Sequence, residues 1–380
     1  MTVADATAPD SAPARRVRIW DLPLRVFHWL LAVAFLTAWL TLDNRFLDLH
    51  VFAGYVMGAL LLLRLSWGFV GGPYARFRAF AYGWPAVRAQ LTALLAGHPR
   101  RYLGHNPTGA WAIYLLLGIG ALVTVTGVWA FGGEEHHGPL APGVDVPWED
   151  LGRRAHAYLA WAMLGMVGLH LGGVTVESLL LRENLVAGML NGCRQTAAPV
   201  PASRAHRSIG LLLGLGVVAA AGIYFQGYWT QSSEQPYRPF LGQALPDDPR
   251  WRQECGECHL AFHPTLLPAR SWRRLMAEQN EHFGEVLALD PEAVAHLREF
   301  LTANAADSER SEPAWKIHRS TAPGEVPLRV TETAYWRRKH AHLDPGVWSD
   351  ARVGRRHNCG ACHLDAEEGT FEDAAMRLPR

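Results

Sequence analysis

Two copies of the pattern Cys-x-x-Cys-His lie in the last third of the chain, at residues 255–259 and 359–363. In this pattern the two thiols can form thioether bonds to a haem while the adjacent histidine binds the iron. A four-cysteine zinc site would not explain why a histidine follows the second cysteine both times. The pattern therefore predicts two covalent c-type haems. Their attachment residues are Cys255, Cys258, Cys359 and Cys362, and their proximal ligands are His259 and His363.

Four further histidines, His28, His50, His156 and His170, lie in long apolar stretches. Fourteen residues separate His156 from His170, which is nearly four helical turns, so both side chains leave one helix face about 21 Å apart along the axis. A buried imidazole in a membrane is costly without a partner, so its default interpretation is functional. The alternative is that some of the four are interfacial or hydrogen-bonded core histidines, since His50 and His156 lie near predicted helix ends.

Apolar runs dominate the first 230 residues, whereas the last 150 are polar. The first run ends in Asp43-Asn44-Arg45 without a small-residue cleavage site, which favours a retained anchor over a removed signal peptide. Residues 1–15 are polar and rich in Pro and Ala, which predicts disorder. Five membrane helices are expected, over residues 24–42, 50–70, 109–131, 155–180 and 208–225.

Arginines predict the orientation of these helices. They are concentrated near the N-terminus and in residues 76–101 and 182–207, whereas the loops at 43–48 and 134–150 are mostly acidic. Positive loops stay in the cytoplasm, so the N-terminus is expected there and, after five crossings, the C-terminal part outside. Arg153 and Arg154 conflict with this rule. Arg64, near the inner end of the second helix, is expected to extend its charge to the membrane surface.

This topology sorts the four membrane histidines by depth. His28 and His170 fall at the inner level of the membrane, and His50 and His156 at the outer level. Two imidazoles on opposite sides of a planar metal macrocycle suit haem iron, whereas zinc needs four ligands in one place. Helical bundles commonly hold cofactors between facing helices. Because no cysteine lies in these helices, we expect two non-covalent b-type haems, at His28/His170 and at His50/His156.

The membrane part resembles a known family. The resemblance lies in VRIWDLPLRVFHW at residues 17–29, in His50 at the start of the second helix, and in the helix with His156 and His170. These features resemble the bacterial cytochrome b561 and nickel–iron-hydrogenase b-type cytochrome family, over residues 16–195. The resemblance implies a four-helix, dihaem, quinone-linked electron carrier.

Each c-type haem needs a sixth ligand or an open site. Met276 is expected in the core instead, because residues 269–285 predict a helix with this methionine on its apolar face. The remaining candidates are His263, His282, His318, His340, His342 and His357.

The C-terminal part resembles the dihaem cytochrome c family of purple bacteria. The resemblance covers residues 250–375 and includes LLPARSW (266–272), HFGE (282–285) and WRRKH (336–340) besides the two motifs. It implies bis-histidine ligation with His282 and His340 as distal ligands, and which of them serves which haem stays open. The other four candidate histidines are expected at the solvated surface. A haem pair without methionine ligands is predicted to have low potentials.

Three polar segments carry further expectations. Glu134, Glu135, His136 and His137, between the third and fourth helices, could accept protons from a quinol; a solvated polar loop is the favoured interpretation. Residues 291–305 predict an amphipathic helix that Asp290 and Pro291 begin. Residues 308–326 predict a polar loop.

The predicted fold class is all-α. A transmembrane four-helix haem-binding bundle with a fifth transmembrane helix is followed by a small, mainly helical dihaem cytochrome c domain. The net charge of +1 argues against an extended nucleic-acid surface. The expected parts are a disordered N-terminus (1–15), the dihaem cytochrome b domain (16–195), a linker with the fifth helix (196–235) and the periplasmic dihaem cytochrome c domain (236–380).

The expected function is electron transfer in the bacterial inner membrane. Electrons would pass between the quinone pool and a periplasmic acceptor, such as a monohaem cytochrome c, through two haems b and then two haems c. Quinol:cytochrome c oxidoreductase activity is compatible with this function, but the chain is expected to be a carrier rather than an enzyme. A homodimer or a larger membrane complex is a further expectation.

Two other functions remain open. The chain could be the membrane-anchoring subunit of a larger hydrogenase or reductase. Alternatively, a c-type haem with an open site could bind a small ligand, and carbon monoxide binding would reveal that site.

Overall fold

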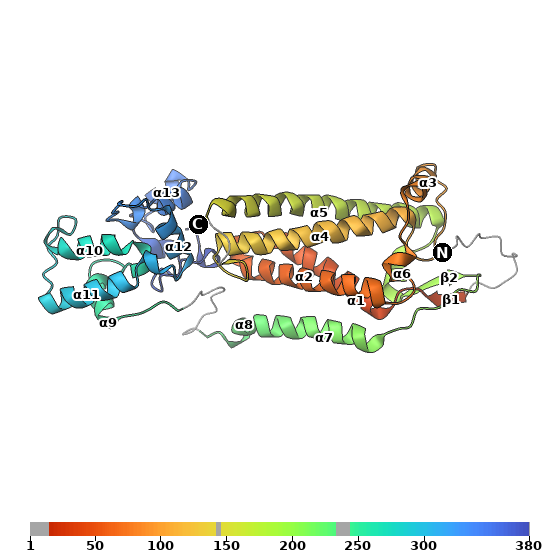
Figure 1. The fold of residues 1–380 in the computed structure, drawn as a ribbon, viewed down its shortest axis with the longest axis horizontal. Helices are drawn as coiled ribbons and strands as arrows, with labels where there is room; N and C mark the ends of the chain where they lie inside the picture. Colours follow the sequence, from red (N-terminus) through yellow and green to blue (C-terminus); the bar gives the residue numbers. More distant parts are fainter. Residues whose placement is uncertain (1–14, 142–145, 233–243, 380) are drawn as a thin grey trace. The chain divides into compact units, whose positions relative to one another are not determined.

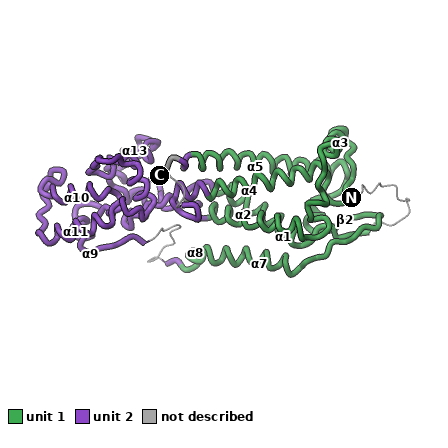
Figure 2. Tube along the Cα trace, in the orientation of Figure 1, with its two compact units in different colours: residues 1–41, 49–128, 151–230 green, residues 42–48, 129–150, 231–380 purple. Residues whose placement is uncertain are grey.

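The computed structural model describes residues 15–141, 146–232 and 244–379. The chain forms two compact units (Figure 2). Unit 1 contains the chain through residue 41 together with residues 49–128 and 151–230. Unit 2 contains residues 42–48, 129–150 and 231–380. The segment 129–150 therefore packs with the C-terminal part of the chain.

Unit 1 is built on five long apolar helices, which run alongside one another in Figure 1. Among the described residues, these five have the length and composition to cross a membrane, which confirms the expected number of spans. Large apolar side chains such as Val33, Leu122 and Leu169 are exposed on them, as expected of helices that face lipid. The helices are α1 (Leu22–Leu40), α2 (Leu47–Val70), α4 (Pro107–Glu134), α5 (Val146–Leu181) and α7 (Arg207–Tyr224).

The buried carboxylate of Asp21 fixes the start of α1. Its Oδ1 accepts a hydrogen bond from the backbone N–H of Leu24 at 3.0 Å, the standard N-cap arrangement. Its Oδ2 accepts from the indole N–H of Trp67 at 3.1 Å and from the N–H of Gly72 at 3.3 Å. Asp21 thus links the first turn of α1 to the end of α2. This link fixes the position of His28, on α1, relative to α2.

The stretch after α5 is ordered rather than a free linker. Strand β1 (Arg15–Arg18) pairs antiparallel with β2 (Cys193–Thr196). The hydroxyl of Ser203 then donates to the carbonyl of Ile19 at 2.8 Å. The start of the connection expected from residue 196 therefore packs on the N-terminal segment. The short helices of unit 1 are α3 (Trp84–Leu95), α6 (Leu185–Asn191) and α8 (Gln226–Thr230).

Helix α7 packs closely against α1. A Cβ atom added at Gly210 would lie 2.6 Å from Cγ of Leu22. Only glycine allows this approach, so Gly210 serves the packing of these two helices.

Unit 2 surrounds a core of large side chains. Trp251, Trp272, Leu297 and Leu301 are buried there, and Met276 is packed among them, as expected. Helix α11 begins with the predicted cap, because Asp290 accepts from the N–H of Ala293 at 2.7 Å. The helices are α9 (Pro249–Gly256), α10 (Ala269–Ala277), α11 (Pro291–Ala303), α12 (Glu312–Ser320), α13 (Ala334–His340) and α14 (Pro345–Ser349).

Two local predictions were wrong. The helix expected over residues 269–285 ends at Ala277, so His282 follows it in irregular backbone. The polar loop expected over residues 308–326 contains α12, which Ser311 caps. Two charged residues of α12, Glu312 and Lys316, are buried and lie 2.8 Å apart. Their mutual neutralisation explains how a polar segment forms an interior helix.

Candidate metal centres

The four membrane histidines lie in two facing pairs. The ring centres of His28 on α1 and His170 on α5 are 6.4 Å apart. Those of His50 on α2 and His156 on α5 are 6.0 Å apart. Two imidazoles that share one metal ion at about 2 Å from each nitrogen have ring centres about 6 Å apart. Each pair is therefore spaced to accept one ion between its rings.

Unit 2 contains two more pairs with the same spacing. His259 of the first Cys-x-x-Cys-His motif faces His282, with ring centres 6.3 Å apart. His363 of the second motif faces His340 at the end of α13, also at 6.3 Å. Within unit 2, the structure thus brings His282 to the first motif and His340 to the second.

Backbone carbonyls orient several of these rings. Nδ1 of His50 lies 2.9 Å from the carbonyl of Ala38, and Nδ1 of His156 lies 3.0 Å from that of Val123. Nδ1 of His340 lies 2.8 Å from the carbonyl of Trp336. An Nδ1–H that donates to a carbonyl leaves Nε2 unprotonated, which is the state a metal ligand requires.

Gly127 on α4 leaves room for the His156 ring. A Cβ atom at this position would lie 3.0 Å from Cε1 of His156. A larger residue would push the imidazole away from His50, so this glycine helps to position the pair.

Arg64 on α2 is a buried residue whose burial the sequence analysis did not predict. It is only 2 % exposed, so it does not extend to the membrane surface as predicted. Its guanidinium lies over the ring of Phe77 at 4.8 Å, and neither Nη1 nor Nη2 has a hydrogen-bond partner among the described residues. Asp21 acts on this charge electrostatically, but a buried guanidinium whose donors lack hydrogen-bond partners is still unfavourable.

His105 is a second unsatisfied polar group near Arg64. Its ring packs between Trp20 and Phe80, at 4.6 and 4.4 Å between ring centres, and its Nδ1 is unpartnered within the described part of the chain. His105 interacts electrostatically with Arg64, His28 and His170. An anionic group beside the His28/His170 pair would satisfy both residues. Haem carries two propionate carboxylates, so these residues fit haem better than a bare metal ion.

The Cys-x-x-Cys-His segments also fit covalent haem. Cys255 and Cys359 are partly buried, and no described cysteine forms a disulfide. The thiols therefore remain available beside His259 and His363 for thioether bonds.

The other candidate histidines of unit 2 differ in their surroundings. His263 was expected at the surface but is 2 % exposed. Its Nδ1 lies 2.8 Å from the hydroxyl of Thr265 and its Nε2 lies 3.1 Å from the carbonyl of Pro246, so both nitrogens are engaged. His342 and His357 are exposed, as expected, and His318 is half-buried.

Segment 134–137 is folded onto unit 2 rather than solvated. The ring of His136 stacks on Trp315 with centres 4.6 Å apart. Nε2 of His137 lies 3.0 Å from Oε2 of Glu372, and this hydrogen bond raises the pKa of His137. Glu135 is 5 % exposed. The favoured interpretation of this segment as a solvated loop was therefore wrong.

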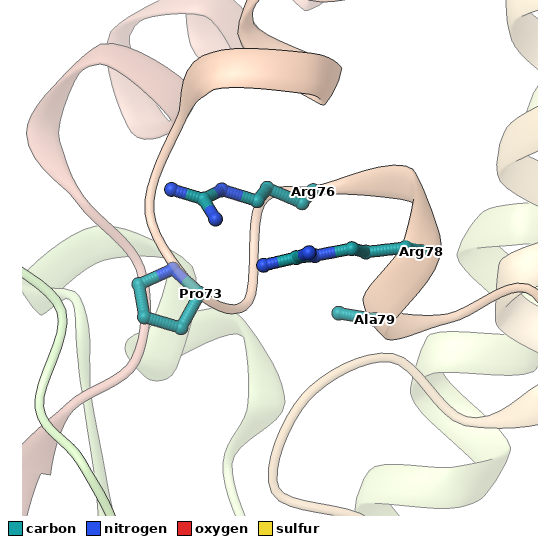
Figure 3. Close-up of a pocket in the computed structure, with 4 residues that line it drawn as sticks. All are labelled: Pro73, Arg76, Arg78 and Ala79. Carbon is teal, nitrogen blue, oxygen red and sulfur yellow. The ribbon is translucent and has the colours of Figure 1, made fainter. Parts of the chain in front are cut away.

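A separate surface pocket, of about 290 Å³, is lined by Pro73, Arg76, Arg78 and Ala79 (Figure 3). Nε of Arg76 donates to the carbonyl of Gly71 at 2.7 Å. None of the candidate haem ligands lines this pocket, so it is not part of the metal centres.

Two family models match the chain in succession. Residues 19–192 match the model of prokaryotic cytochrome b561, and residues 251–371 match that of dihaem cytochrome c. The first match contains all four membrane histidines, and the second contains both Cys-x-x-Cys-His motifs.

Relatives of the membrane part include two proteins described as probable Ni/Fe-hydrogenase B-type cytochrome subunits. The protein of Rhizobium leguminosarum bv. viciae is 24 % identical over 225 residues, which cover 50 % of this chain and 94 % of that protein. The protein of Azotobacter vinelandii is 27 % identical over 213 residues, which cover 47 % of this chain and 88 % of that protein.

Two solved structures are similar to the C-terminal part. The diheme cytochrome c from Rhodobacter sphaeroides is 41 % identical and covers 34 % of this chain and 99 % of its own length, with a TM-score of 0.30. A diheme cytochrome type c from Shewanella baltica OS155 is 31 % identical and covers 36 % of this chain and 95 % of its own length, with a TM-score of 0.29.

Proposed function

Because the chain joins a prokaryotic cytochrome b561 domain at residues 19–192 to a member of the dihaem cytochrome c family at residues 251–371, we propose that it is a tetrahaem membrane electron carrier. It would pass electrons between the quinone pool and an acceptor outside the cytoplasm. The five apolar helices indicate a multi-pass membrane protein. The two family matches indicate electron transfer with haem b and haem c.

One observation carries the proposed count of two haems b and two haems c. Four histidine pairs have ring centres between 6.0 and 6.4 Å apart, two in each unit. The pairs in unit 2 each include the histidine of a Cys-x-x-Cys-His motif, whereas the pairs in unit 1 have no cysteine nearby in sequence. Covalent attachment is therefore proposed only for the haems at the pairs in unit 2.

The residues of the chain hold, orient and tune these groups. Haem iron supplies reversible one-electron chemistry at each site. Carbonyls of Ala38 and Val123 keep Nε2 of His50 and His156 available for binding. Arg64 and His105 would bind a haem carboxylate beside the His28/His170 pair, which removes the cost of their burial.

The paired rings argue against a small-ligand site. A histidine faces each motif histidine at 6.3 Å, so two imidazoles would be available to hold the iron of each c-type haem. The reduced protein should therefore bind little carbon monoxide.

The proposed topology follows the arginine distribution. From the positive loops we infer an N-terminus in the cytoplasm and residues 236–380 in the periplasm, with residues 16–195 as the cytochrome b part and 196–235 as the connection. This assignment agrees with bacterial c-type haem attachment, which takes place outside the cytoplasm. Because the two parts are fused, the encounter between the haem b sites and the haem c sites would be intramolecular, at a high effective concentration.

A second candidate function is a subunit of a larger complex. The relatives of the membrane part are described as hydrogenase cytochrome subunits. Under this function, the chain would anchor a catalytic partner and connect it to the quinone pool. Copurification with a nickel–iron, molybdenum or flavin subunit would favour this second candidate.

The test of the proposed function is the variant His156→Ala. In the wild-type protein, electrons from quinol should reach the c-type sites through the His28/His170 site and then the His50/His156 site. The variant should lose one b-type haem, keep both c-type haems, and show much slower reduction of the c-type haems in stopped-flow measurements. His98→Ala, which changes an exposed histidine, is the control. If the c-type haems of His156→Ala were reduced at the wild-type rate, the proposed order of sites would be contradicted.

A further inference from the structure

Within unit 2, the segment 134–137 packs against α12 and the C-terminal residues. The ammonium of Lys316 donates to the backbone carbonyl of Glu134 at 2.6 Å. His136 stacks on Trp315, and His137 binds Glu372. These contacts bring the carboxyl group of Glu135 into the interior of unit 2.

Glu135 joins two other carboxyl groups there. One carboxylate oxygen from each of Glu135, Glu312 and Asp373 lies within 4.8 Å of the other two. Glu135 is 5 % exposed and Glu312 is 3 % exposed. We call these three residues the carboxyl cluster. Close, buried carboxylates repel one another unless cations or protons neutralise them.

Two lysines neutralise part of the carboxyl cluster. Oε1 of Glu312 lies 2.8 Å from Nζ of Lys316 and 3.6 Å from Nζ of Lys339, and it accepts a hydrogen bond from the hydroxyl of Tyr335 at 3.1 Å. Lys339 also lies 3.8 Å from Oδ1 of Asp373. Three ionised carboxylates would exceed two ammonium groups by one negative charge.

Glu312 has an oxygen that these lysines do not use. Its Oε2 is buried and has no hydrogen-bond partner among the residues that the structure describes. A proton held between carboxyl groups would satisfy such an oxygen and remove the excess negative charge. Burial, together with the nearby Glu312 and Asp373, raises the pKa of Glu135 well above its ordinary value, which agrees with a retained proton.

A proton fits this place better than a divalent cation. Calcium takes six to eight oxygen ligands, whereas the carboxyl cluster offers three carboxyl groups, two of which already face lysines. The ammonium groups would also repel a second cation.

The carboxyl cluster is electrostatically linked to a proposed haem site. Lys339 directly precedes His340 on α13. Asp373 and Lys339 both act on the imidazole of His363 through their charges. A change of charge between His340 and His363 is therefore transmitted to the groups around Glu135.

We propose that the carboxyl cluster holds one proton that is released when the haem between His340 and His363 is oxidised. Oxidation removes one electron to the acceptor and adds one positive charge at the iron. The carboxyl O–H bond then breaks, the proton leaves to water, and the carboxylate balances the new charge. Reduction reverses both steps. The inference rests on the proposed His340/His363 ligation and deepens the proposed function by coupling a proton to its electron.

Other charged groups surround Glu135 and contribute to the field at its carboxyl group. Segment 42–48 reaches the carboxyl cluster through the amide of Asn44, which donates to Oδ2 of Asp373 at 3.4 Å. Among the described residues, further titratable or charged groups near the carboxyl cluster include Glu134, His136 and His137 of the same segment, Lys316 of α12, Tyr335 and Lys339 of α13, His363 and Glu372.

The test is a redox titration of the purified, haem-loaded full-length protein from about pH 5.5 to about pH 9. In the wild type, the midpoint potential of one c-type haem should fall as pH rises, by up to about 59 mV for each tenfold fall in proton concentration. Glu135→Gln keeps the shape of a protonated carboxyl but cannot lose its proton, so this slope should disappear. Glu299→Gln, which changes an exposed carboxylate of α11, should keep the wild-type slope.

Three results would overturn the inference: a wild-type potential that does not depend on pH, an unchanged slope in Glu135→Gln, or a potential that shifts with added calcium or chelator. Proton release on oxidation, followed with a dye in weak buffer, gives a second readout and should also be lost in Glu135→Gln. Haem content is measured on the same samples. Absence of two c-type haems would refute the proposed function, whereas a full haem complement without the slope would refute this inference alone.

Discussion

Arg64 is a buried cation in an apolar helix, and its surroundings are visible only in three dimensions. In sequence it resembles any arginine near a helix end, which can reach the membrane surface with its long side chain. The packing of Phe77 around the guanidinium removes that route. The four membrane histidines, by contrast, could be paired from helical spacing and depth alone, because both quantities are fixed by position along the chain.

Replacement of Arg64 by Leu should lower both the potential and the occupancy of the inner b-type haem. Loss of the positive charge favours oxidised iron, so the potential of the His28/His170 haem should fall by on the order of 50 mV. Haem occupancy should also fall, because a carboxylate partner is lost. Spectroelectrochemical titration of the b-type absorbance measures both effects.

Arg64→Lys and Arg78→Ala are the controls for this change. Arg64→Lys keeps the charge and should preserve much of the b-type potential. Arg78 is exposed, so Arg78→Ala should leave this potential unchanged. An unaltered b-type potential in Arg64→Leu would mean that the guanidinium does not neighbour a haem carboxylate.

His340 should determine the potential of the second c-type haem. Methionine is a weaker donor that favours reduced iron, so His340→Met should raise that potential by on the order of 100 mV. The methionine-to-iron charge-transfer band should appear in the variant and be absent from the wild type. His342→Met, at an exposed position nearby, should change neither property. A charge-transfer band of this kind in the wild type would contradict bis-histidine ligation.

At the scale of elements, hydropathy predicted the membrane helices well, because length and apolar composition decide whether a helix can span lipid. The same approach missed α12. Glu312 and Lys316 make this segment polar in composition, yet they are one helical turn apart and bind each other in the interior. The sequence does not show which charges neutralise one another, so it could not predict that α12 is buried.

Packing of segment 134–137 should weaken as pH rises above neutral. The hydrogen bond to Glu372 raises the pKa of His137 above its ordinary value. While Glu372 stays ionised, the pair therefore stabilises the segment fully below the unfolded pKa of about 6.5, and this stabilisation is lost as pH rises through the folded pKa of His137. The loss should be about 1 kcal/mol for a partly exposed pair.

Hydrogen exchange of residues 134–137 measures this effect. Exchange, corrected for its intrinsic pH dependence, should quicken about fivefold across this transition. In His137→Gln the segment should exchange faster at low pH and lose the transition. Constant protection of the wild type across the range would show that the His137–Glu372 pair does not hold the segment.

For the whole molecule, composition indicated a membrane part and a polar part, but not how the chain is divided between compact units. Segment 129–150 comprises the end of α4, the start of α5 and the residues between them, yet it belongs to unit 2 because His136, His137 and Glu135 pack there. Such long-range packing depends on partners more than 170 residues away, such as Trp315. Local sequence patterns contain no information on these partners.

The central claim is that one chain holds two haems b and two haems c. A pyridine haemochrome assay on the purified full-length protein, combined with protein quantification, tests it most directly. Extraction with acidified acetone separates non-covalent from covalent haem. We predict two extractable b-type haems and two protein-bound c-type haems per chain. Recovery of c-type haem alone would contradict the assignment of the four membrane histidines.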